Sequence, residues 1–216
     1  MKIREIHAYP DLVLYPPTVT RPFRDRSRSL CNYLERQLRG SPFVTKGFSR
    51  VCVVGTSKPK DSPIVNSAGA LVAEVPFDLA NYQSATGNRW NELLIEILTA
   101  GFAKADDLLP ISDLQAGIGA FRGAGYVNEW VHKERKFRAE ALKAELHCAL
   151  TTESFVLRLR LHKENHLILD QKIQETIPDE TVFQRELNDV KIIEDEIRVF
   201  DKAGKVLWGK PVAALG

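Results

Sequence analysis

Alternation of apolar and polar residues in the second half of the chain is the feature that most limits the fold. Apolar residues recur at every second position within 144–150, 155–161 and 167–169. Successive side chains of a strand point to opposite faces, so a period of two predicts strands with one buried and one exposed face. The connectors, 151–154 and 163–165, are short and polar, as β-hairpins require. We therefore expect a three-stranded antiparallel meander.

Helical periodicity is found in a few segments outside the meander. Residues 89–106 carry apolar side chains at i, i+3, i+4 and i+7, and Asn88 before them is a favourable N-cap. A short amphipathic helix with an arginine face is expected over 27–39, because Gly40 and Pro42 follow it as a stop signal. Residues 179–189 predict another short helix, with acids in its first turn.

Further strands are predicted on both sides of these helices. The β-branched runs 48–54 and 71–77 favour extended structure, and residues 197–208 predict a closing hairpin. The expected fold class is α+β, with a mainly antiparallel sheet formed by the C-terminal meander and the closing hairpin. Two to four helices are expected to pack on one face of that sheet.

The first 45 residues are rich in proline and arginine. Proline fixes φ and restricts the residue before it, which disfavours a long helix here. The prolines concerned are Pro10, Pro16, Pro17 and Pro22. We expect a single domain over 1–216, in which 1–45 form an N-terminal extension and short helix that wrap a mixed body. Residues 140–210 would form the antiparallel β-rich half.

Charge is unevenly distributed, although the whole chain has 30 Lys and Arg against 28 Asp and Glu. Residues 1–60 hold twelve basic and four acidic residues, whereas 170–201 hold ten acidic and four basic ones. The two ends therefore predict surfaces of opposite sign.

Targeting and metal-binding signals are weak. No window approaches the about 18 consecutive apolar residues of a membrane helix, and no signal peptide is indicated, so we expect a cytoplasmic protein that does not bind membranes. The cysteines, Cys31, Cys52 and Cys148, are odd in number and lack C-x-x-C spacing, which predicts reduced thiols. His162 and His166 flank a turn, without further ligands placed by spacing. Neither a metal nor another cofactor is expected.

Catalytic motifs are also incomplete. The glycines from Gly117 to Gly125 do not form a dinucleotide fingerprint, because Arg122 occupies the position of its third glycine. They favour a structural role, in a loop or at a close approach of helices. Cys148 and His147 are adjacent on a predicted strand and therefore point to opposite faces, so they cannot pair as thiolate and imidazole.

These observations favour a non-catalytic, cytoplasmic protein-binding module over an enzyme. Its most specific version is a bacterial immunity or antitoxin-type inhibitor that occludes a toxin active site through an acidic surface. A basic protein would suit such a surface, because complementary charge speeds encounter and fixes orientation. The expected partner-binding residues are Asp179, Glu180, Glu186, Asp189, Glu194, Asp195, Glu196, Arg158 and Arg160.

Two alternatives remain at this stage. An enzyme for an anionic or phosphate-bearing substrate would use the glycine segment, Arg122 and a histidine such as His147 or His162. A nucleic-acid-associated subunit of a larger assembly would use the N-terminal arginines, although the near-neutral chain is less basic than most such proteins. Those arginines are Arg21, Arg24, Arg26, Arg28, Arg36 and Arg39.

Overall fold

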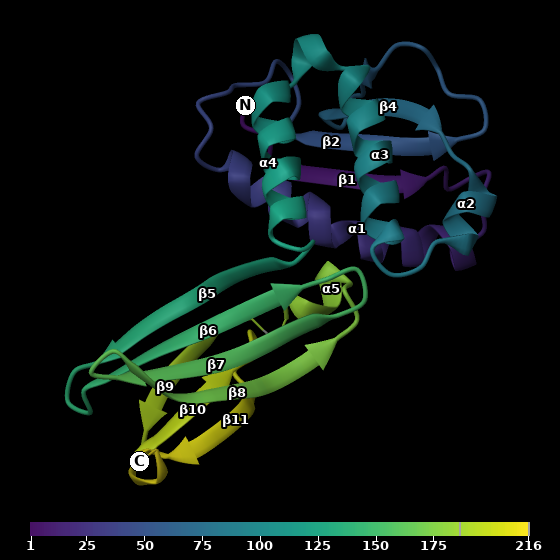
Figure 1. Ribbon diagram of the computed structural model, residues 1–216. Helices are drawn as coiled ribbons and strands as arrows, with labels where there is room; N and C mark the ends of the chain where they lie inside the picture. The colour runs from purple at the N-terminus through teal and green to yellow at the C-terminus, as the bar shows by residue number, and fades with distance from the viewer. Residues whose placement is uncertain (186, 216) are drawn as a thin grey trace. The chain divides into compact units, whose positions relative to one another are not determined.

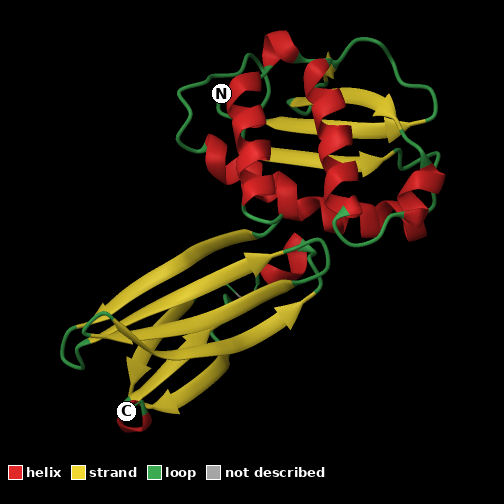
Figure 2. Cartoon of the chain, viewed as in Figure 1, coloured by secondary structure: helices red, strands yellow, loops and turns green. Residues whose placement is uncertain are grey.

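The chain divides into two compact units, Met1–Asn128 (unit 1) and Glu129–Gly216 (unit 2). The computed structural model describes residues 1–185 and 187–215. Each unit has its own apolar core. The α+β class is confirmed: most strands lie in antiparallel sheets, and the described residues form five α-helices (Figures 1 and 2). Folding of residues 1–216 as one domain stays a prediction.

The sheet of unit 1 has the strand order β1-β2-β4-β3. β1 pairs with β2 and β2 with β4 in parallel, whereas β3 pairs with β4 in antiparallel orientation. This sheet is therefore mixed. Its parallel pairs were not predicted, because the sequence prediction of a mainly antiparallel sheet rested on the second half of the chain. Its strands are β1 (Glu5–Pro10), β2 (Arg50–Thr56), β3 (Ile64–Val65) and β4 (Ala70–Pro76).

Helices cover one face of this sheet, and Figure 1 shows α3 and α4 in front of its strands. α3 approaches β2 so closely that a Cβ at Gly101 would lie 2.5 Å from the Val53 side chain. Glycine permits this contact because it has no side chain. The helices of unit 1 are α1 (Pro17–Leu38), α2 (Leu79–Ser84), α3 (Arg89–Ala103), the short 3-10 helix η1 (Asp106–Leu108) and α4 (Ile111–Gly123).

The N-terminal segment differs from its prediction. It contributes strand β1 to the central sheet, followed by the 22-residue helix α1. Prolines permit this helix because Pro16 is its N-cap and Pro17 its first residue, where no intrahelical bond is lost. Pro22 lies inside the helix and removes one backbone donor. Residues 1–45 are thus part of the core of unit 1 and not a wrapping extension.

One local prediction at α3 is also corrected, and the glycines of α4 take one of the two structural roles expected of them. The Asn88 side chain makes no capping hydrogen bond, because its backbone is helical, with φ −65° and ψ −16°. The glycine segment is mainly the second half of α4. A Cβ at Gly117 would lie 2.8 Å from Leu34 Cδ2, so this glycine marks a close approach of α4 to α1.

Unit 2 contains two antiparallel sheets, ordered β5-β6-β7-β8 and β11-β10-β9, which Figure 1 shows as two layers. The meander is confirmed as β6 to β8, and the closing hairpin as β10 and β11. The predicted helix over 179–189 is only α5, because the chain enters β9 at Asp189. The strands are β5 (Asn128–Phe137), β6 (Leu142–Leu150), β7 (Phe155–Lys163), β8 (His166–Thr176), β9 (Asp189–Ile193), β10 (Glu196–Phe200) and β11 (Val206–Pro211), with helices α5 (Glu180–Phe183) and η2 (Val212–Ala214).

The core of unit 2 explains the alternation. Leu146, Leu157 and Leu159 are completely buried, and so are Ile197 and Val199 of the second sheet. Two sheets that each bury one face against the other form a sandwich core. In the part of the chain that is described, no helix has both the length and the apolarity to cross a lipid bilayer.

Candidate functional site

The acidic residues expected to bind a partner lie at separate places in unit 2. The Asp179 carboxylate caps α5 by accepting the Thr181 backbone N–H at 2.9 Å. Glu194 and Asp195 form the β9–β10 turn, at the opposite end of β9 from Asp189. Five residues of strand separate these ends by about 16 Å. Glu186 lies outside the described residues.

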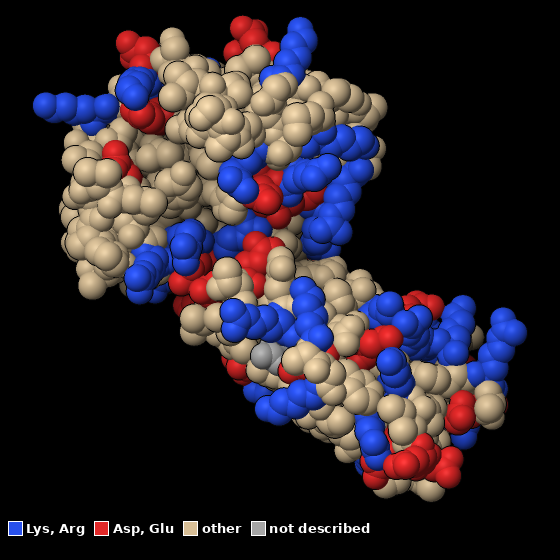
Figure 3. Space-filling model, turned by 180° about the vertical axis from the view of Figure 1, so that it is seen from behind, with Lys and Arg blue, Asp and Glu red and all other residues tan. Residues whose placement is uncertain are grey.

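Several of these acids are engaged by arginines. Asp189 accepts two hydrogen bonds from Arg135, at 2.9 and 2.8 Å. Arg198 contacts Glu196 at 2.9 Å and Glu194 at 3.6 Å. Glu180 accepts a hydrogen bond from Gln184. Figure 3 shows blue and red side chains interspersed over this unit, so its surface is mixed in charge.

The two arginines expected to bind a partner, Arg158 and Arg160, lie together on the outer face of the meander. Arg158 and Arg160 both contact Asp170 on β8, at 2.6 and 3.3 Å. Asp170 has a lowered pKa: burial opposes the shift, but the two guanidinium groups outweigh it. Each arginine therefore meets a carboxylate within unit 2 and is about one third exposed.

The N-terminal arginines do not form one basic surface. Arg28 is 5% exposed and forms a buried ion pair with Glu35, so its side chain does not contribute to a basic surface. Arg26 lies over the Trp90 ring at 4.2 Å, and Arg36 donates to the Asn128 side chain. The arginines that remain exposed are Arg21, Arg24 and Arg39.

Arg122, the proposed phosphate contact, is also paired. Its Nε and Nη2 donate to the two carboxylate oxygens of Glu92, at 2.9 and 2.7 Å. Tyr126 donates its hydroxyl to the same carboxylate at 2.7 Å. The hydrogen bonds from Arg122 and Tyr126 lower the pKa of Glu92 to about 2. This network ties the end of α4 to α3 and does not form a phosphate loop.

The histidines of the meander are separate from its cysteine. Cys148 is completely buried in the core, and His147 faces the other side of the strand, as alternation predicts. Burial lowers the pKa of His147, whose Nε2 lies 3.8 Å from Glu129. No three His, Cys, Asp or Glu side chains of the described chain are grouped closely enough to hold a metal ion.

A titratable row on the sheet of unit 1 was missed at the sequence level. His7 pairs in register with Cys52, and Glu5 with Arg50, on the face opposite α3. Glu5 accepts hydrogen bonds from Arg50 at 2.6 Å and His7 at 3.3 Å. Burial raises the pKa of the Cys52 thiol, so it remains protonated near neutral pH and is a poor nucleophile. Only the pairing of β1 with β2 brings these residues together.

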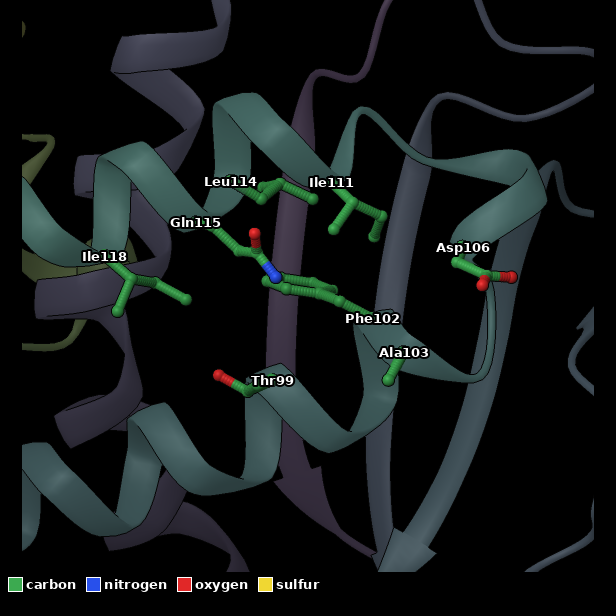
Figure 4. A pocket seen from close by; sticks show the side chains of 8 residues that line it. All are labelled: Thr99, Phe102, Ala103, Asp106, Ile111, Leu114, Gln115 and Ile118. Carbon is green, nitrogen blue, oxygen red and sulfur yellow. The ribbon is translucent and has the colours of Figure 1, made fainter.

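A cavity lies between α3 and α4 and is a candidate binding site. Its volume is about 250 Å³. Phe102 of α3 and Leu114 and Ile118 of α4 form an apolar floor, each at most 5% exposed. Figure 4 shows Thr99 and Gln115 on opposite walls, with their polar atoms directed toward the space between the helices. We call this feature the α3–α4 groove; its remaining lining residues are Ala103, Asp106 and Ile111.

One end of the α3–α4 groove is acidic. Asp106 lines the groove and is exposed, as is Asp107 beside it. Asp113, also exposed, accepts the Ser41 hydroxyl at 2.7 Å. The only basic residue between 99 and 118 is Lys104, whose ammonium donates to the Lys60 carbonyl at 2.7 Å. Asp113 does not line the groove, which thus combines an apolar floor with a negative rim at Asp106.

Only one of the two helices that form this groove could be predicted from the sequence. The periodicity of 89–106 identified α3, but the glycines from Gly117 to Gly125 left both a loop and a close approach of helices open, so α4 itself was not predicted. Without α4, no second wall could be placed beside α3.

The chain matches no protein-family model, no curated protein and no solved structure.

Proposed function

We propose that this chain is a protein-binding module that docks a protein partner in the α3–α4 groove. The observation that carries the proposal is a cavity of about 250 Å³ with an apolar floor, open between two exposed helix faces. Binding energy at protein interfaces is concentrated in a few apolar or aromatic anchors that enter such depressions. A groove between helices is also a recurrent site for helical segments of other proteins.

The specific version of the proposal is a cytoplasmic immunity or antitoxin-type inhibitor. A protein of this kind binds a toxin and blocks the access of substrate to its active site. The acidic end of the groove, at Asp106 and Asp107, favours a basic partner because complementary charges steer encounter. The acids of unit 2 stay a second predicted contact, of which Asp195 and Asp179 would contribute most because Asp189 and Glu196 already pair with arginines.

The alternatives receive less support from the geometry. Arg122, on which the enzyme hypothesis depended, meets the Glu92 carboxylate with two hydrogen bonds. The nucleic-acid hypothesis loses Arg28 to a buried ion pair. Neither observation favours a second function over protein binding.

The experiment is affinity capture of the tagged full chain from its source lysate, with a variant that fills the groove. Ala103→Trp places an indole at an exposed lining position of α3. Ala100→Trp is the matched control, because Ala100 is exposed on the same helix and does not line the groove. We expect a stoichiometric protein that is retained by the wild type and by Ala100→Trp but lost from Ala103→Trp.

Two results would contradict the proposal. A captured protein that binds Ala103→Trp as well as the wild type would place docking outside the groove. Recovery of nucleic acid or of no macromolecule would remove protein binding as the function. A captured partner that is a toxin should lose its activity when the wild-type chain is added, which tests the inhibitor version separately.

A further inference from the structure

The α3–α4 groove also indicates the chemistry of its occupant. We infer that the groove accepts an apolar side chain from a partner segment that carries a lysine or arginine nearby. This inference rests on the proposed function and adds the kind of sequence that is recognised.

The apolar requirement follows from the floor of the groove. Phe102, Leu114 and Ile118 line the cavity and are 4%, 1% and 5% exposed, so its floor offers no free polar group. A polar side chain placed there would lose its water without gaining a partner, which is unfavourable. An aliphatic or aromatic side chain would instead remove apolar surface from water.

The basic requirement follows from the rim. Asp106 lines the cavity, and its Oδ1 accepts the neighbouring Asp107 N–H at 2.9 Å. The adjacent Asp107 is also exposed, and Lys104 is held toward the Lys60 carbonyl. A cation beside the apolar anchor would therefore meet a net negative field.

The most exposed apolar turn of a second copy fits the groove poorly. The most exposed apolar segment among the described residues is the turn Leu12, Val13 and Leu14, with exposures of 68%, 93% and 53%. Asp11 holds this turn by accepting the Val13 N–H at 2.8 Å. An apolar turn with a carboxylate at its base would bring like charge to the acidic rim of another copy.

The test is selection of helical peptides from a displayed library against the wild-type full chain, followed by affinity measurement of the enriched peptides by fluorescence anisotropy. We expect enrichment of an apolar residue with Lys or Arg one turn away. Replacing that basic residue by Glu should weaken binding about threefold to tenfold, and Asp106→Asn should remove most of this charge preference. Ala103→Trp should abolish binding, whereas Ala100→Trp should not.

Other outcomes would overturn the inference. They are the absence of any enriched peptide, enrichment of acidic peptides, or peptides that bind Ala103→Trp unchanged. Self-association of the wild-type chain that is lost in Ala103→Trp would instead identify a second copy as the occupant. If Ala103→Trp does not fold, Gln115→Arg blocks the opposite wall from an exposed position of α4. A lysate partner that depends on the groove but lacks a basic anchor would refute the inference and leave the proposed function intact.

Discussion

Arg28 and Glu35 form a buried ion pair on α1, with 3.0 Å between Arg28 Nη2 and Glu35 Oε2. The same two side chains bind the edge strand β1: Glu35 accepts the Ile6 N–H and Arg28 donates to the Ile6 carbonyl, both at 2.7 Å. The pair therefore takes the place of a neighbouring strand at Ile6. The second half of α1 thereby holds the outer edge of β1.

Glu35→Gln should destabilise the protein by about 3–5 kcal/mol, because the Arg28 charge would remain buried without its counter-charge. The double variant Arg28→Met/Glu35→Leu should not recover full stability, since the N–H and carbonyl of Ile6 would then lack partners. Urea unfolding of the three proteins measures both effects. A fully stable double variant would mean that the pair contributes nothing to holding β1.

Glu92 should make stability depend on pH in the acid range. Its pKa in the folded protein is about 2, below the 4.5 of an ordinary glutamate, so its contribution is present above about pH 4.5 and is lost as the pH falls toward 2. The carboxylate is partly exposed, which limits the contribution to about 1 kcal/mol.

Unfolding of wild type and Glu92→Gln at neutral and acid pH tests this contribution. The difference in unfolding free energy should be largest at neutral pH and should shrink on acidification. Glu153→Gln, at an exposed position in a turn of unit 2, is the control. A difference that stays constant with pH would show that the carboxylate charge is not responsible.

The glycines of the α3–α4 region should respond in opposite ways to alanine. Gly101→Ala would place its Cβ 2.5 Å from Val53 and should destabilise by about 1–3 kcal/mol. Gly119 lies within α4 with nothing within 4 Å of an added Cβ, so Gly119→Ala should stabilise by about 0.5–1 kcal/mol. Thermal unfolding of the two variants provides the comparison, and equal effects would contradict the packing of α3 on β2.

Most of the fold of unit 2 could be predicted from the sequence, whereas much of unit 1 could not. Alternation marks each strand of the meander because one face is buried and the other is exposed. Parallel pairing of β1 with β2 joins segments far apart in the chain, and no local pattern reports it. α1 was predicted too short because Pro22 suggested a boundary, although tertiary packing of Phe23 and Leu30 stabilises the helix through it.

The candidate site was harder to predict for a related reason. Individual charges were visible in the sequence, but their partners were not: Asp189 with Arg135, and Arg122 with Glu92, are pairs between distant segments. A side chain that already forms an ion pair within the protein is less available to a partner, so the charges alone did not identify the contact residues. The groove needed both helices, and glycines concealed one of them.

The turn Glu194-Asp195 provides a test of the acidic surface of unit 2. Both residues have positive φ, 52° and 62°, which Asn and Gly adopt more readily. Glu194→Asn/Asp195→Gly should therefore stabilise the protein by about 0.5–1 kcal/mol while removing two acids. Unchanged affinity for a captured partner would exclude this turn from the interface, and a large loss would include it.

The three cysteines should resist thiol reagents in the folded protein. Cys31, Cys52 and Cys148 are buried and form no disulfide, and the raised pKa of Cys52 further reduces its thiolate fraction. Absorbance with Ellman's reagent should show little reaction in native buffer and all three thiols in denaturant. Rapid reaction of Cys52 in native buffer would contradict its burial. It would also indicate that Cys52, beside His7 on the neighbouring strand, is a reactive thiol.

Hydrogen–deuterium exchange of the full chain, with and without its captured protein partner, tests the central claim most directly. Docking in the α3–α4 groove predicts slower exchange of amides in 99–118 on binding, with little change in 189–196. Protection confined to 189–196, with unchanged exchange in 99–118, would contradict the groove as the docking site.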